Sequence, residues 1–148
     1  MEIRLNDWIL EVDFDRTSKF YNDMDDEIQC DCLSCQNYRL YLKKNNGVRS
    51  FFQQLGIDPF KDGDYTSYGV PENGRLLYLG VYHIVGVIVS GPTVITDMWS
   101  NVNLTKVEDF NIGFSYELRC VDPDFPEPII QLEFEANLPW LLDKEWAE

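Results

Sequence analysis

Basic residues and histidine are scarce in this chain of 148 residues. Lysine and arginine together number 12 against 26 aspartates and glutamates, so the formal net charge is −14, and His83 is the single histidine. A negative field of this size repels a phosphate backbone, and we therefore expect no direct binding of nucleic acid. The same field would attract a basic protein surface.

Several common functional motifs are also missing. The sequence contains no glycine-rich phosphate loop, no nucleophile elbow and no pair of histidines at helical spacing. The longest apolar run, residues 76–89, is broken by two glycines and His83 and is too short to span a bilayer. Residues 1–5 lack the basic and apolar parts of a signal peptide. We therefore expect a cytoplasmic protein without a membrane partner.

The chain is rich in aromatic residues. Hydrophobic residues make up 45% of the chain and aromatic residues 14%. This content is that of a folded protein with a well-filled core, and flat rings favour strands because they pack on pleated surfaces. No repeat or linker divides the sequence, and its length suits one domain. We expect residues 1–148 to form that single domain.

The first residues predict a hairpin followed by a short helix. Apolar side chains punctuate residues 3–5 and 8–13, and Asn6-Asp7 lies between them, which predicts two strands joined as a hairpin. Residues 15–18 are expected to cap a short helix that carries Phe20 and Tyr21.

A pair of helices is predicted next. Residues 33–44 have a helical composition, and an asparagine–glycine segment ends them. A second apolar face follows at helical spacing, made by Val48, Phe51, Phe52 and Leu55. Gly56 is placed to end this second helix in the left-handed conformation.

The remainder of the chain predicts strands. The expected strands are residues 65–70, 76–79, 84–89, 94–99, 111–121 and 129–135. The apolar run 76–89 is divided here near Tyr82-His83, because it is long and interrupted by glycine. Residues 122–128 contain three prolines and predict a loop, and Pro139 is expected to open one helical turn over residues 139–142.

These elements predict an α+β fold. It consists of a predominantly antiparallel sheet of about six to eight strands, with the short helix pair from the first third of the chain packed on one face or edge.

Three of the four cysteines lie close together, at Cys30, Cys32 and Cys35. The spacing of Cys32 and Cys35 lets one chain reversal present two thiolates to a tetrahedral zinc ion, and Cys30 would add a third. A fourth ligand has to come from elsewhere in the chain, and Cys120 is the natural candidate, with His83 as the alternative. The four cysteines are therefore the candidate ligands of one structural zinc.

Two other interpretations of the cysteines remain open. Cys32 or Cys35 would be a catalytic nucleophile if the start of the helix lowered its pKa and His83 served as the base. The acidic side chains of residues 25–27 and 31 oppose this, because like charge raises a thiol pKa. The cysteines are otherwise small buried apolar side chains around a tight loop.

Three stretches taken together resemble a family of small uncharacterised bacterial proteins. They are C-x-C-x-x-C-x-N-Y at residues 30–38, FFQQLGIDP at residues 51–59 and YLGVYHIVG at residues 78–86. The hairpin near residue 6 and LPWLL at residues 138–142 also fit, so the resemblance covers most of the chain. It implies no activity and no site, since none is established for that family.

The sequence as a whole favours a non-enzymatic binding or interaction module. One concrete version is an immunity-type protein that covers the cationic cleft of a basic nuclease toxin, because a compact domain of charge −14 would compete with a phosphate backbone. The alternative is a cysteine-dependent enzyme that uses Cys32 or Cys35 with His83.

Overall fold

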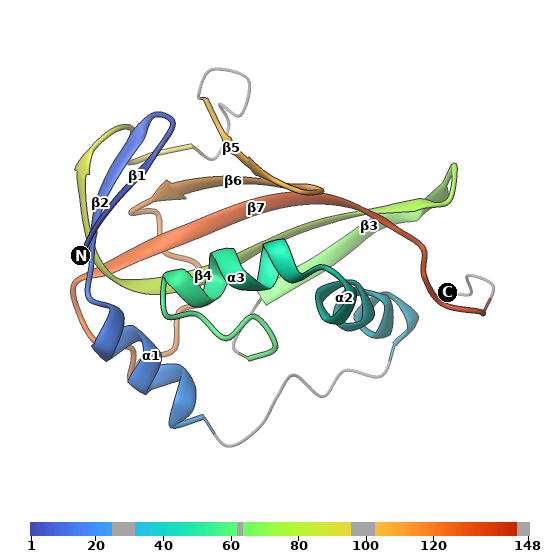
Figure 1. Ribbon diagram of the computed structural model, residues 1–148, viewed down its shortest axis with the longest axis horizontal. Helices are drawn as coiled ribbons and strands as arrows, with labels where there is room; N and C mark the ends of the chain where they lie inside the picture. Colours follow the sequence, from blue (N-terminus) through green and yellow to red (C-terminus); the bar gives the residue numbers. More distant parts are fainter. Residues whose placement is uncertain (25–31, 62–63, 96–102, 145–148) are drawn as a thin grey trace.

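A computed structural model describes residues 1–24, 32–61, 64–95 and 103–144 (Figure 1). The α+β fold predicted from the sequence is confirmed. The elements in chain order are β1 (Glu2–Leu5), β2 (Trp8–Val12), α1 (Phe14–Asn22), α2 (Leu33–Lys44), α3 (Asn46–Gln54), β3 (Asp64–Glu72), β4 (Arg75–Ser90), β5 (Thr105–Val107), β6 (Phe110–Ser115) and β7 (Ile129–Pro139).

The seven described strands form one antiparallel sheet in the order β1-β2-β4-β7-β6-β5, with β3 also paired to β4. The sheet curves strongly, and the turn of the β1–β2 hairpin reaches the residues before β5. The Asn6 amide donates to the Leu104 carbonyl at 2.6 Å, and the Asn103 amide donates to the Asp7 carboxylate at 2.8 Å. The two ends of the strand order are thus joined by hydrogen bonds.

Strand β4 organises this sheet. One edge of β4 pairs with β7 from Arg75 to Val85, while the other edge pairs with β3 up to Val81 and with β2 from Gly86 onward. The predicted division near Tyr82-His83 is therefore wrong. The glycines that suggested a break permit close packing instead, because a side chain at Gly86 would collide with the Glu11 carbonyl of β2.

Helix α1 fills the gap that β3 and β2 leave along β4. The Tyr21 hydroxyl donates to the His83 carbonyl at 2.9 Å and accepts from the His83 amide at 3.3 Å. The Thr17 hydroxyl accepts from the Val85 amide at 3.0 Å, and the Asp13 amide donates to the Val85 carbonyl at 2.8 Å. Side chains of a helix thereby satisfy backbone groups that a strand would otherwise pair.

Helices α2 and α3 cover one face of the sheet (Figure 1). Their aromatic side chains interlock there with rings from β3, β4, β6 and β7. We call this set the aromatic cluster; its members are Tyr38, Tyr41, Phe52, Tyr65, Tyr78, Tyr82, Phe110 and Phe134. Gly80 makes room for it, since a side chain at that position would lie 2.6 Å from the ring of Phe134.

Several boundaries differ from those expected. Helix α1 begins at Phe14 and is capped by Asp13, whose carboxylate accepts from the Arg16 amide, so residues 15–18 lie inside the helix. Strand β6 ends at Ser115 instead of continuing to residue 121. Residues 139–142 form no helical turn, because Pro139 belongs to β7 and the next amide donates to the Gly74 carbonyl.

Other local predictions are confirmed. The helix pair spans residues 33–44 and 46–54, and Gly56 follows it with a φ of 87°. Residues 94–95 are not part of a strand, and the rest of the strand expected at 94–99 lies outside the described residues. Within the described ranges, no helix is long and apolar enough to cross a bilayer.

Candidate functional site

The structure places Cys32 and Cys35 at the start of α2. Cys32 is the N-cap residue and is exposed, while Cys35 lies in the first turn and is partly buried. The Cys35 thiol adjoins the hydroxyl of Tyr65 on β3, on the face of the sheet that the aromatic cluster occupies. Cys30 lies outside the described residues.

Cys120 lies on the other face of the sheet. Its thiol is exposed and donates a hydrogen bond to the carboxylate of Asp64, which raises the pKa of the thiol. Asp64 and Tyr65 are neighbours on β3, and successive side chains of a strand point to opposite faces. The structure therefore does not bring Cys120 to Cys32 and Cys35.

Metal ligation by the cysteine loop stays a prediction. Among the described residues, no three side chains of histidine, cysteine, aspartate or glutamate are grouped to hold a metal ion. Asn37, two positions after Cys35, instead holds the C-terminal segment: its amide donates to the Pro139 carbonyl and accepts from the Leu141 amide.

His83 is buried on the face opposite the aromatic cluster. Only 1% of it is exposed, and its Nε2 lies 3.2 Å from Oε1 of Gln131. That oxygen only accepts hydrogen bonds, so Nε2 carries a proton and donates to it. Burial lowers the pKa of His83. Its neighbour Tyr82 points into the aromatic cluster, so His83 does not face Cys32 or Cys35.

A buried polar network surrounds His83. Glu133, 2% exposed, accepts from the Ser115 hydroxyl at 2.5 Å, from the Gln131 amide at 3.2 Å and from the Arg119 guanidinium at 3.1 Å. Gln131 also accepts from the Arg119 backbone amide and donates to the Glu117 carbonyl. Because these bonds reach residues after β6, the network holds the start of the β6–β7 loop against the sheet.

This network was not predicted from the sequence. Gln131 and Glu133 alternate with apolar residues in β7, and such a pattern is typical of a solvated strand face. The loop of residues 116–128 folds back over that face and buries both side chains. A cavity of about 380 Å³ remains beside them, lined by Asp64, Arg119 and Cys120 among others. In the network, the Glu133 carboxylate already has three partners.

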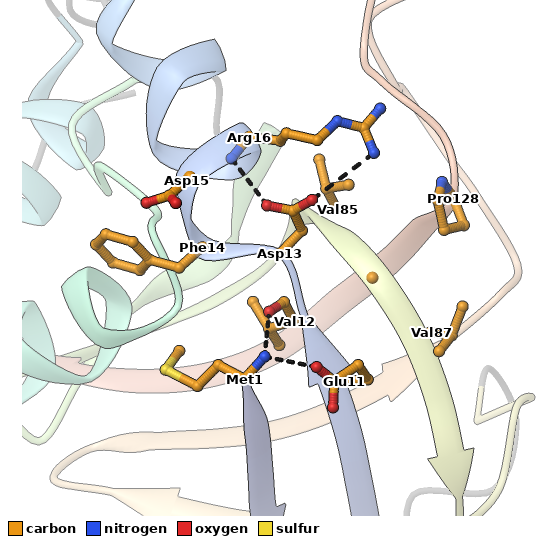
Figure 2. A pocket seen from close by; sticks show the side chains of 11 residues that line it. Met1, Glu11, Val12, Asp13, Phe14, Asp15, Arg16, Val85, Val87 and Pro128 are labelled. Atoms are coloured by element: carbon orange, nitrogen blue, oxygen red, sulfur yellow. Dashed lines mark hydrogen bonds and ion pairs between the residues drawn. The ribbon is translucent and has the colours of Figure 1, made fainter.

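Exposed apolar side chains gather at one end of the molecule. Among the described residues, large hydrophobic side chains are exposed at Met1, Phe14, Tyr68, Val70, Val87, Val89, Val94, Tyr116 and Leu118. Met1, Phe14 and Val87 line a cavity of about 480 Å³ (Figure 2). Leu118 lines a neighbouring cavity of about 390 Å³, and Pro128 belongs to both.

Tyr116 connects this group to β4. Its hydroxyl accepts from the Ile88 amide at 2.6 Å, between the exposed side chains of Val87 and Val89. Among the exposed apolar side chains of the described residues, Tyr68 and Val70 on the β3–β4 hairpin and Val94 are not part of this group. We call the remaining surface the apolar–acidic face; its apolar part is Met1, Phe14, Val87, Val89, Tyr116, Leu118 and Pro128.

Carboxylates surround the apolar part of this face. They belong to Glu11, Asp13, Asp15 and Glu127. Figure 2 shows two cations among them: the amino group of Met1 pairs with Glu11 at 2.5 Å, and Arg16 lies 3.8 Å from Asp13. Four carboxylates against two cations leave the rim of the face negative.

Comparison with protein-family models, with curated proteins and with solved structures finds no match for this chain.

Proposed function

We propose that this protein is a non-enzymatic interaction module that binds a basic partner protein through the apolar–acidic face. The observation that carries the proposal is the gathering of exposed apolar side chains at one end, inside a rim of carboxylates. Exposed apolar patches with a polar rim are typical of docking surfaces. A partner with basic side chains around an apolar contact would match this face.

The two parts of the face have different roles in binding. Burial of side chains such as Leu118 and Phe14 removes apolar surface from water, which provides most of the affinity. The carboxylate rim speeds encounter with a cationic partner and disfavours acidic competitors. Basic side chains are concentrated in another part of the chain: residues 33–61, which include the helix pair, carry five basic side chains and one acidic one. The helix pair would therefore turn away from a basic partner.

An immunity-type role is the most concrete version of this function. The partner would be a nuclease toxin, and the apolar–acidic face would cover the cationic cleft that binds phosphate. Acidic side chains would then occupy the place of the nucleic-acid backbone. The rim carboxylate of Glu127 lies on the β6–β7 loop, in the same cavity lining as the exposed side chain of Leu118.

The test begins with affinity capture from the cells that produce the protein, followed by identification and purification of the captured partner. Titration calorimetry then compares Leu118→Asp and Val89→Asp with Val70→Asp, a matched control on the β3–β4 hairpin that is 56% exposed. We expect each face variant to weaken binding by about 2 kcal/mol, or about 30-fold, and the control to leave it unchanged.

Salt dependence provides the second readout. Glu127→Lys should slow association several-fold at low ionic strength and have less effect at high salt. The reason is that salt screens the long-range attraction between the carboxylate rim and a cationic partner. The proposal fails if no basic partner with salt-sensitive binding is captured. It also fails if Val70→Asp weakens binding as much as Leu118→Asp does.

A further inference from the structure

We infer that Cys32 and Cys35 form a reversible disulfide, which makes the start of α2 a redox-sensitive site. This inference is independent of the apolar–acidic face. It rests on the helical positions of the two cysteines, on their exposure and on the anchoring of the first turn of α2.

The two cysteines occupy helical positions whose side chains face each other. Cys32 has extended backbone angles, with φ −63° and ψ 158°, and its carbonyl accepts the first helical hydrogen bond from the Gln36 amide at 3.0 Å. It is therefore the N-cap residue, and Cys35 is the third residue of the helix. The side chain of an N-cap residue lies over that third residue, as in a capping box.

The Cys32 thiol lies beside Ser34, the second residue of the helix. It makes no capping hydrogen bond to the backbone, and its sulfur lies 3.3 Å from the hydroxyl oxygen of Ser34. A side-chain rotation within the first turn can bring the sulfur to Cys35 without moving the helix. The two residues also differ in exposure: Cys32 is exposed to an incoming reagent, and Cys35 is partly buried next to Tyr65.

The first turn is anchored to the sheet independently of the cysteines. The Tyr78 hydroxyl donates to the Ser34 carbonyl at 2.6 Å, and the buried amide of Asn37 bonds Pro139 and Leu141. These contacts hold the backbone around both cysteines in place. The two sulfurs therefore remain at the start of one anchored helix in the dithiol and the disulfide forms, which favours formation of a short internal bridge.

The reaction requires a low-molecular-weight disulfide as oxidant, such as glutathione disulfide. The Cys32 thiolate attacks one sulfur of the oxidant and releases one glutathione thiolate. The Cys35 thiolate then attacks the Cys32 sulfur of this mixed disulfide and releases the second glutathione. Two protein thiols lose two electrons and two protons, and the oxidant is reduced to two molecules of glutathione. Excess glutathione reverses both steps.

The experiment equilibrates the untreated full-length protein with mixtures of glutathione and glutathione disulfide. After quenching with acid, intact mass and peptide mapping with cleavage after Leu33 identify the products. We expect a species that has lost two hydrogens and carries a Cys32–Cys35 bridge. The mixed disulfide should stay below about a tenth of it, because a neighbouring thiol of the same chain competes with millimolar glutathione at high effective concentration.

Three variants provide controls. Cys32→Ser and Cys35→Ser should stop at a glutathione adduct or remain reduced, whereas Cys120→Ser should oxidise like the original protein. Cys120 is a matched control, since it is also exposed but lies on the other face of the sheet. Circular dichroism confirms that each variant is folded.

Several results would overturn the inference. A bridge from Cys30 to either cysteine would assign the redox chemistry to another pair. A glutathione adduct that persists on Cys32 in the original protein would show that Cys35 does not resolve it. Oxidation that requires removal of bound zinc by a chelator would count for the metal site and against a redox role.

Discussion

The hydroxyl groups of Tyr38 and Tyr82 form a buried chain with a fixed direction. The Tyr82 hydroxyl donates to the Pro59 carbonyl at 2.8 Å, because a carbonyl oxygen only accepts. Tyr82 has one hydroxyl proton, so the hydrogen bond of 2.7 Å between the two tyrosines is donated by Tyr38. Both tyrosine side chains are 0% exposed.

This direction makes two similar substitutions unequal. Tyr82→Phe leaves the Pro59 carbonyl without its donor and the Tyr38 hydroxyl without its acceptor. Each unsatisfied buried group costs about 1–3 kcal/mol, so we expect a loss of about 2–6 kcal/mol in the free energy of unfolding. Tyr38→Phe removes one hydrogen bond while Tyr82 keeps its bond to Pro59, and the expected loss is about 1 kcal/mol.

Urea unfolding followed by circular dichroism measures both losses, with Tyr68→Phe as a control. Tyr68 is 51% exposed, and its substitution should change stability by less than about 0.5 kcal/mol. The double variant should lose less than the sum of the single losses, because Tyr38→Phe removes the group that Tyr82→Phe leaves unsatisfied. Equal losses for the two single variants, or a larger loss for Tyr38→Phe, would refute the assigned direction.

Three further predictions concern a glycine and titrating groups. Gly56→Ala should reduce the free energy of unfolding by about 1–2 kcal/mol more than Gly74→Ala does, as measured by denaturant unfolding. Both glycines have a positive φ, but only at Gly56 would the new methyl group contact α1, at 3.0 Å from Thr17. Burial raises the pKa of the tyrosines in the aromatic cluster. Their contribution to the free energy of unfolding should therefore be complete below about pH 10 and decline above it, because the unfolded chain loses these protons first. Denaturant unfolding at several pH values between about 8 and 11 measures this decline. Burial lowers the pKa of His83. The free energy of unfolding should therefore decrease as the pH falls below about 6.5, because the unfolded chain binds the proton first. NMR spectra of the folded protein should show a neutral ring at that pH.

The sequence by itself determined the elements whose causes are local. The hairpin turns at residues 6–7 and 73–74 follow from asparagine and glycine, which tolerate positive φ. The helix pair at 33–54 followed from composition and apolar spacing. The end of the second helix followed from Gly56, because glycine readily adopts the left-handed conformation that ends a helix. The alternation of apolar and polar residues determined strands such as β7. Each of these features depends on residues within a few positions of one another.

The tertiary structure alone decided which residues meet across the sheet. The length of β4 depends on Thr17 and Tyr21, which satisfy its backbone between two partner strands. The separation of Cys120 from Cys35 depends on the faces to which β3 directs Asp64 and Tyr65. The apolar–acidic face joins residues that are far apart in the sequence, from Met1 to Pro128. Composition and spacing do not encode such contacts, because strand register and loop path depend on how all the elements pack together.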